Sequence, residues 1–434
     1  MLGIRMAPVL VVVSVVAGLV PATAAQANPG PRTLFTWRGD QTGERYGFAV
    51  SQLADVNRDG AEEAVIGAPF HTDATGVVVG IVEVRSGRSG NVLFRFTGAQ
   101  LDSFGYAVAD AGDVDGDGVH DIVAGAPGVR VLACNSAPRT GRAYVFSGRT
   151  GAQLLMVSGA AAGDQFGAAV GAVGDLNRDG RGDILVGAPC HDGPNGVDAG
   201  AAYVVSGRDG QILRQYDGEQ AGDGFGWGTA GLGDIVGNRP VDYLVGAKDA
   251  GPGDRGLAYV YSDRSGEQRA VLQGDESTFD FGWFFVATAG DVDRDGREDI
   301  YVGDFCALDP VGGCTNPRGQ AYVFSGRTYQ QIRLYTGVAD GDGAGPGRSA
   351  GDVNRDGYDD VAVGLYSSSA GAQFGGRVQV RSGRDGAVLY DDISTIAGET
   401  LGYDVVGLGD VNRDRRADLL ISGATLDVVY LKST

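Results

Sequence analysis

The stretch that decides the fold is Phe104-Gly105, then Asp113-Val-Asp-Gly-Asp-Gly-Val-His-Asp121, then Ile122-Val-Ala-Gly-Ala-Pro127. Its acidic part, Asp-x-Asp/Asn-x-Asp-Gly-x-x-Asp/Glu, recurs along the chain. Intact copies start at Asp55, Asp113, Asp175, Asp291 and Asp352, a copy without the glycine starts at Asp410, and a decayed copy starts at Asp234. These starts are 58, 62, 59, 57, 61 and 58 residues apart. Such a period is too long for heptads or leucine-rich repeats and suits one four-stranded blade of a β-propeller.

The strands of one blade follow from the second copy. A first, innermost strand is predicted over 105–109, where small residues suit a crowded propeller axis. The acidic loop leads into a second, fully buried strand over 121–126, and a third strand covers 142–147. A Ser-Gly-Arg-x-Gly hairpin then leads to an outer strand over 152–158. Seven copies of four antiparallel strands predict an all-β, seven-bladed propeller.

The two ends of the chain are predicted to complete one blade together. The last copy provides only three strands, over 403–407, 418–421 and 426–431, whereas residues 32–39 match the outer strands of the other copies. The N-terminal strand is therefore expected to lie beside residues 426–431 and to close the ring, which protects open sheet edges.

Net charge and the N-terminal pattern limit the classes of function that this chain can have. The chain has 434 residues and a net charge of −20, which argues against nucleic-acid binding because phosphate contacts need a basic face. Arg5, the apolar run 9–20 and Ala25-Gln26-Ala27 together have the pattern of a secretory signal peptide. The alternative, a membrane anchor, is disfavoured because this run is too short to span a bilayer. We therefore expect a signal peptide over 1–27, a propeller over 28–434, and a secreted protein without membrane insertion.

The order of these motifs resembles the FG-GAP repeat of the integrin α-subunit N-terminal propeller. The resemblance covers roughly residues 32–434, and Gly-Ala-Pro is intact at Gly67, Gly125 and Gly187. It is eroded in Gly246-Ala-Lys, Gly303-Asp-Phe and Gly364-Leu-Tyr. The resemblance implies calcium in the acidic loops and a ligand on the opposite face of the propeller. We expect a free-standing secreted propeller without the other integrin domains, so integrin-style signalling is not implied.

The acidic loops have the chemistry of calcium sites. Side chains at loop positions 1, 3, 5 and 9 and the carbonyl of position 7 converge as hard oxygen ligands, which suit Ca²⁺ better than Mg²⁺. The alternative is that these are only Asp-rich turns. The predicted ligands are Asp55, Asn57, Asp59, Ala61, Glu63; Asp113, Asp115, Asp117, Val119, Asp121; Asp175, Asn177, Asp179, Arg181, Asp183; Asp291, Asp293, Asp295, Arg297, Asp299; Asp352, Asn354, Asp356, Tyr358, Asp360; Asp410, Asn412, Asp414, Arg416 and Asp418.

Two loops depart from this pattern. In the fourth loop, Val236 replaces an oxygen ligand and Arg239 replaces the glycine, so this blade is expected to hold no metal. In the seventh loop, Arg415 replaces the glycine of the reversal. The seventh site is therefore predicted to be the weakest of about six.

Four cysteines in an exported chain predict two disulfides. Three pairings are possible. The simplest joins Cys134 to Cys190, in equivalent loops of neighbouring blades, and Cys306 to Cys314, in one loop. Free or metal-binding thiols are the alternative, which export and the lack of a Cys-x-x-Cys pair disfavour.

Enzyme chemistry has little support in the sequence. Gly-x-Ser-x-Gly, zinc-spaced histidines and phosphate loops are absent. His120 lies inside an acidic loop, and His71 and His191 are expected to be surface loop residues rather than parts of a shared site. We expect a monomeric calcium-binding module for adhesion to a protein or glycan. The alternative is an exported hydrolase or polysaccharide lyase with its active site in the top-face cavity.

Strand alternation divides the loops between two faces. The acidic loops and the Ser-Gly-Arg-x-Gly hairpins share one face, and both expected disulfides, His71 and His191 lie on the other. Loops on that other face vary in length, so a partner is expected there. The candidate contacts are Arg130, Arg139, Asp192 and Arg318, with Trp227 and Trp283 either as aromatic anchors or packed between blades.

Overall fold

The computed structural model describes residues 31–128, 134, 139–233, 242–262, 265–305 and 318–434. The expected signal peptide, Cys306, Cys314, Arg130 and all of the fourth acidic loop except Asp242 lie outside these residues. In the described part of the chain, no helix has the length and apolar character needed to cross a membrane.

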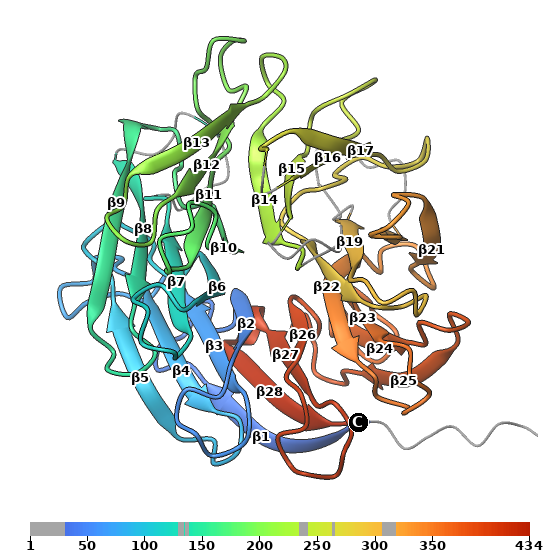
Figure 1. Ribbon diagram of the computed structural model, residues 1–434. Helices are drawn as coiled ribbons and strands as arrows, with labels where there is room; N and C mark the ends of the chain where they lie inside the picture. The colour runs from blue at the N-terminus through green and yellow to red at the C-terminus, as the bar shows by residue number, and fades with distance from the viewer. Residues whose placement is uncertain (1–30, 129–133, 135–138, 234–241, 263–264, 306–317) are drawn as a thin grey trace, which may run out of the picture.

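Seven four-stranded antiparallel sheets form a ring, as predicted (Figure 1). The strands, blade by blade, are β2 (Ala49–Leu53), β3 (Glu63–Ala68), β4 (Ile81–Ser86), β5 (Val92–Thr97); β6 (Ala107–Gly112), β7 (Asp121–Ala126), β8 (Thr140–Phe146), β9 (Gln153–Ala162); β10 (Ala169–Gly174), β11 (Asp183–Ala188), β12 (Ala201–Val205), β13 (Ile212–Asp217); β14 (Phe225–Gly231), β15 (Tyr243–Ala247), β16 (Leu257–Tyr261), β17 (Gln268–Leu272); β18 (Val286–Gly290), β19 (Asp299–Asp304), β20 (Gln320–Phe324), β21 (Gln331–Thr336); β22 (Ala344–Gly351), β23 (Asp360–Leu365), β24 (Arg377–Arg381), β25 (Val388–Ile393); β26 (Val405–Gly407), β27 (Leu419–Gly423), β28 (Val428–Ser433) and β1 (Arg32–Arg38). A short 3₁₀ helix, η1 (Ala424–Leu426), precedes β28.

The ring closes in the predicted way. Strand β1 pairs antiparallel with β28, with Trp37 opposite Val429, so the first and last segments of the chain share the seventh sheet. The innermost strands β2 and β26 contact each other across this closure. The described strands therefore form a continuous circle of blades.

The core lies between blades rather than within one sheet. Every residue of β3, β7, β11, β19 and β23 is buried, whereas the outer strands alternate between exposed and partly buried residues. One core cluster joins Val65 and Val82 of the first blade to Ile122, Ala124 and Tyr144 of the second. Apolar burial of this kind is the main favourable term that holds neighbouring sheets together.

Paired glycines set the distance between neighbouring blades. Gly105 adopts φ +85°, and its N–H donates to the Gly125 carbonyl at 3.0 Å, so β6 begins at Ala107 rather than at residue 105. A Cβ added to Gly125 would lie 2.0 Å from the carbonyl oxygen of Gly167 in the next blade. The same contact recurs between Gly67 and Gly105, Gly187 and Gly226, Gly246 and Gly282, Gly303 and Gly345, and Gly364 and Gly402.

We predict that Gly125→Ala lowers the free energy of unfolding by about 1–3 kcal/mol or more. The new methyl group would overlap a backbone oxygen, which can move only if its strand moves with it. Gly171→Ala in β10 is the matched control, because its Cβ would meet neighbouring backbone atoms at 3.5–3.6 Å, an ordinary contact. Chemical denaturation of both variants measures the difference. Equal stability of the two variants would contradict the proposed role of the glycine contact.

Candidate functional site

The second acidic loop, Asp113–Asp121, shows how these segments are built. The Asp113 carboxylate accepts backbone N–H bonds from Asp117 at 3.0 Å and from Gly118 at 2.9 Å. The Asp115 side chain accepts a bond from Asp117 N–H, and the Asp117 side chain accepts one from Val119 N–H. The carboxylates therefore hold the turn in shape while their remaining lone pairs stay available.

All six predicted loops have this structure. In each, the backbone N–H groups of positions 5 and 6 donate to the carboxylate of position 1, at distances of 2.7–3.1 Å. The seventh loop has the same bonds, because Arg415 adopts φ +70° and its backbone N–H donates to the Asp410 carboxylate at 2.7 Å. The reversal thus survives the loss of glycine, at the conformational cost that a side chain incurs in the left-handed region.

The carboxylate at position 9 is the buried anchor of each loop. Glu63, Asp121, Asp183, Asp299, Asp360 and Asp418 are all fully buried. Burial raises the pKa of Glu63 to about 8, that of Asp299, Asp360 and Asp418 to about 7, and that of Asp121 and Asp183 to about 6. A nearby positive charge would stabilise these groups in their ionised form.

The Ser-Gly-Arg-x-Gly hairpins lie against the acidic loops. The Gly148 N–H of one hairpin donates to Asp121 at 3.0 Å, and Gly207, Gly326 and Gly383 make the equivalent bond to position 9 of their own loops. Arg149 adds an ion pair to Asp117 at 2.5 Å. The two motifs therefore share one face of the propeller, as predicted from strand alternation.

The geometry is compatible with divalent cations. Carboxylate oxygens of Asp113, Asp115 and Asp121 lie within 4.8 Å of one another, and so do those of Asp291, Asp293 and Asp295. The other four loops have Asn in place of Asp at position 3, namely Asn57, Asn177, Asn354 and Asn412. An amide oxygen is also a ligand for hard cations, so the donor set of all six loops fits such an ion.

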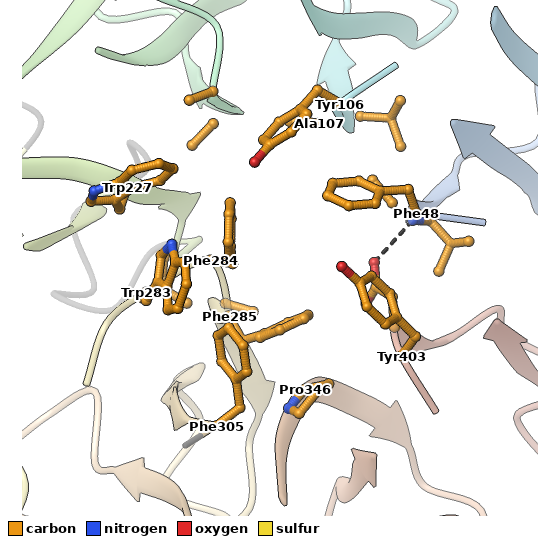
Figure 2. Close-up of a pocket in the computed structure, with 18 of the residues that line it drawn as sticks. Phe48, Tyr106, Ala107, Trp227, Trp283, Phe284, Phe285, Phe305, Pro346 and Tyr403 are labelled. Atoms are coloured by element: carbon orange, nitrogen blue, oxygen red, sulfur yellow. Dashed lines mark hydrogen bonds between the residues drawn. The ribbon is translucent and has the colours of Figure 1, made fainter. Parts of the chain in front are cut away.

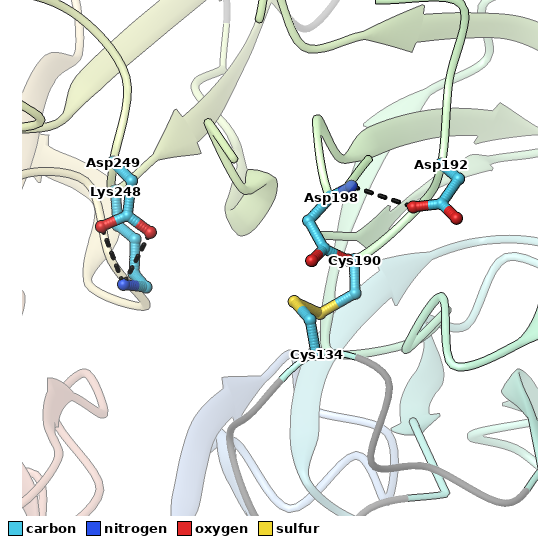
Figure 3. Close-up of a disulfide and its surroundings, with 6 residues drawn as sticks. All are labelled: Cys134, Cys190, Asp192, Asp198, Lys248 and Asp249. Atoms are coloured by element: carbon cyan, nitrogen blue, oxygen red, sulfur yellow. Dashed lines mark hydrogen bonds and ion pairs between the residues drawn. A yellow bond between two sulfur atoms is a disulfide. The ribbon is translucent and has the colours of Figure 1, made fainter. Parts of the chain in front are cut away.

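The opposite face holds the disulfide and the predicted contact residues. Cys134 and Cys190 are joined, which confirms one of the two expected bridges (Figure 3). Arg139, Asp192 and Arg318 are exposed. Asp192 accepts a bond from Asp198 N–H at 2.9 Å, and Arg318 pairs with Asp340. The described candidates are therefore accessible from solvent.

A ring of buried acids just before the Phe-Gly positions was not foreseen. These acids are 1–6% exposed and stand two or three residues before the glycine in every blade, at Glu44, Asp102, Asp164, Asp223, Asp280, Asp342 and Glu399. His71 pairs with the first of them, and His191 pairs with the third at 2.9 Å. Both histidines lie in loops after second strands, as expected, but their side chains are mostly covered, with 14% and 17% exposed. The regular spacing of the acids was the available sequence signal.

The propeller axis holds a cavity of about 520 Å³ with aromatic walls (Figure 2). The residue after the Phe-Gly glycine lines it in every blade, and these residues are Phe48, Tyr106, Ala168, Trp227, Trp283, Pro346 and Tyr403. Trp227 is 2% exposed and packs with Cys190, Trp283 and Phe284, so it is not an exposed anchor. The prediction of small residues at the axis is correct for residues within the innermost strands, such as Ala107. It is wrong for most of the residues that follow the Phe-Gly glycines, which are aromatic.

Comparison with known proteins agrees with this architecture. The FG-GAP repeat model matches residues 104–146 and 166–205. These residues belong to the second and third blades, so FG-GAP repeats form part of this seven-bladed propeller. It is 30% identical over 215 residues to integrin α-5 of Xenopus laevis and 35% identical over 218 residues to integrin α-IIb of Homo sapiens. These matches cover 46% and 47% of this chain but only 20% of either relative, so the chain spans about a fifth of their length.

A solved structure supports the fold alone. The crystal structure of Sqt1 of Saccharomyces cerevisiae aligns with 94% of this chain and 100% of the Sqt1 chain, with a TM-score of 0.54 and 8% sequence identity. Such low identity carries no argument about function.

The buried carboxyls predict a pH dependence in the metal-free protein. Each has a pKa near 4 when unfolded and a raised pKa when folded, so the folded chain binds protons more tightly. This contribution to stability is complete below about pH 4 and is lost as the pH rises through about 6–8. We predict that Tm in chelator falls by several degrees between about pH 5 and about pH 8. Differential scanning calorimetry tests this, and a Tm that rises over the same interval contradicts it.

Proposed function

We propose that this FG-GAP propeller is a secreted, calcium-stabilised module that binds a protein ligand on the face opposite its acidic loops. The observation that carries the proposal is the division of the two faces. Six loops of one repeated structure lie on the first face, and loops of different length and chemistry lie on the second.

Calcium is supported by the donor set. Each loop gathers carboxylate or amide oxygens at positions 1, 3 and 5 above a buried carboxylate at position 9. A buried carboxylate is costly unless a charge compensates it, and Ca²⁺ accepts six to eight oxygen ligands. The position 7 carbonyl is assigned to the same site. The fourth blade, in which Val236 and Arg239 replace the required residues, is assigned no metal.

Export is supported by two features. The pattern of residues 1–27 is that of a cleaved signal peptide. The Cys134–Cys190 disulfide belongs to a class of bond that persists in oxidising compartments. Extracellular calcium is abundant, so weak sites are sufficient there.

A protein ligand is supported by the similarity to integrin α subunits. The variable face offers exposed charges of both signs, including Arg139, Asp192 and Arg318, on loops held by a rigid scaffold. The Cys134–Cys190 bridge links loops of neighbouring blades on this face. A glycan array is the parallel assay that would instead favour a carbohydrate ligand.

Removing calcium should destabilise the protein. At about 1 mM Ca²⁺ and dissociation constants of about 0.1–1 mM, each site adds roughly 0.4–1.4 kcal/mol to the free energy of unfolding. For about six sites, chelation is expected to lower Tm by roughly 3–10 °C, and Mg²⁺ is expected to restore it poorly. Thermal unfolding with a calcium chelator tests this.

Single-residue variants test whether an individual acidic loop binds calcium. Asp113→Ala is expected to remove one calcium equivalent in isothermal titration calorimetry, whereas Asp209→Ala, in an exposed hairpin, removes an acid without affecting any site. An unchanged melting curve in chelator, or equal calcium uptake by both variants, contradicts the calcium assignment.

The binding face has its own test. Partners captured from extracellular protein mixtures by the calcium-loaded chain would be measured against Arg139→Ala, Asp192→Ala and Arg318→Ala. We expect at least one substitution to weaken binding about tenfold or more, without a change in Tm, because these side chains are exposed. Arg208→Ala, on the acidic-loop face, is the control. Weaker binding by Arg208→Ala alone would show that the ligand binds the acidic-loop face, which contradicts the proposal.

A further inference from the structure

The cavity on the propeller axis has a closed aromatic wall (Figure 2). Phe48, Tyr106, Phe284, Phe305, Tyr366 and Tyr403 follow one another around it with ring centroids 4.8–6.3 Å apart, and the circle closes between Tyr403 and Phe48 at 5.5 Å. These residues stand before the innermost strands or after the second strands, so the cavity occupies the half of the axis away from the acidic loops. Its volume of about 520 Å³ lies within the range of small-molecule sites.

The wall contains polar groups that the protein itself does not satisfy. Tyr106 and Thr229 are 4% and 8% exposed, and within the described residues their hydroxyls have no hydrogen-bond partner. The Tyr106 hydroxyl is directed toward the middle of the cavity in Figure 2. Trp283 Nε1 and Arg348 Nε, which can only donate, also have no partner in this part of the chain. A ligand with acceptor oxygens would supply hydrogen-bond partners for these donors.

The charged residues that line the cavity favour an anion over a cation. Asp404 is the acid in its lining, and it already accepts bonds from Val50 N–H at 2.9 Å, from Val405 N–H at 2.8 Å and from Arg348. Arg45 also lines the cavity, and its guanidinium donates to the Thr425 hydroxyl at 2.8 Å and forms no ion pair within the described residues. Lys248, which pairs with Asp249 at 2.8 Å, covers the Trp283 ring at 5.1 Å. The lining itself therefore has two arginines, Arg45 and Arg348, and one carboxylate, that of Asp404.

We propose that this cavity binds a small organic carboxylate with an apolar, ring-containing body. The ring packs against the aromatic wall, and the carboxylate lies toward Arg45. Its oxygens accept hydrogen bonds from the Tyr106 hydroxyl, Trp283 Nε1 and Arg348 Nε, which have no partner within the described residues. The cavity lies on the same side of the propeller as the protein-binding face, but its lining does not include Arg139, Asp192 or Arg318, and it does not depend on the acidic loops or their metal.

Tryptophan fluorescence can report binding directly. The chain has three tryptophans, so a Trp37→Phe background leaves only Trp227 and Trp283, both of which line the cavity. Phenylacetate is expected to change this fluorescence in a saturable way and to raise Tm. Phenylacetamide, which has the same ring without the charge, is expected to bind about 10–100-fold more weakly.

Variants then locate the carboxylate. Arg45→Gln is expected to abolish the preference for phenylacetate over phenylacetamide, whereas Arg38→Gln, on the exposed edge strand β1, leaves it intact. Tyr106→Phe keeps the ring and is expected to weaken phenylacetate severalfold. Tighter binding of benzyltrimethylammonium than of phenylacetate, equal binding of acid and amide, or no binding of phenylacetate by the Trp37→Phe protein each overturns the proposal.

Discussion

The close approach of glycine backbones at six of the blade boundaries is the constraint on which the rest of this propeller depends. Within the second blade, Gly105 N–H donates to the Gly125 carbonyl, and Gly125 in turn lies against the Gly167 carbonyl of the third blade. No side chain fits at Gly125, because a Cβ would lie 2.0 Å from that oxygen. Each inter-blade contact thus joins the Gly-Ala-Pro glycine of one blade to the Phe-Gly glycine of the next. Within one blade, these two glycines are separated by the acidic loop and the two strands that it joins.

The same geometry explains why the acidic loops are uniform. Each loop joins two strands whose far ends are fixed by the glycine contact, so the loop has little freedom in length. Its position 9 carboxylate, such as Asp121, begins the fully buried second strand and accepts the Gly148 N–H from the neighbouring hairpin. Burial raises the pKa of that carboxyl to about 6, while Asp113 and Asp115 stand close by. A cluster of this kind is most stable when a cation is shared among its oxygens.

Much of the fold could be predicted from the sequence because its period is regular and its ends are complementary. The ring closure by residues 32–39, the hairpins beside the acidic loops and the Cys134–Cys190 bridge were all deduced correctly. The pairing of His71 with Glu44 and of His191 with Asp164 was not, because each partner lies 27 residues earlier, in the preceding crossover between blades. Such pairings depend on how loops from different parts of a repeat meet, which periodicity does not describe.

The apparent decay of Gly-Ala-Pro in the later blades has a structural explanation. In the fifth and sixth blades the proline position is occupied by Phe305 and Tyr366, and both side chains belong to the wall of the axial cavity. In the fourth blade Lys248 takes that position and covers Trp283. The glycine that makes the inter-blade contact is retained in all three copies, so the contact tolerates these changes. The later repeats have therefore kept the residue that spaces the blades and replaced the one that faces the axis, which is why the cavity is aromatic on that side.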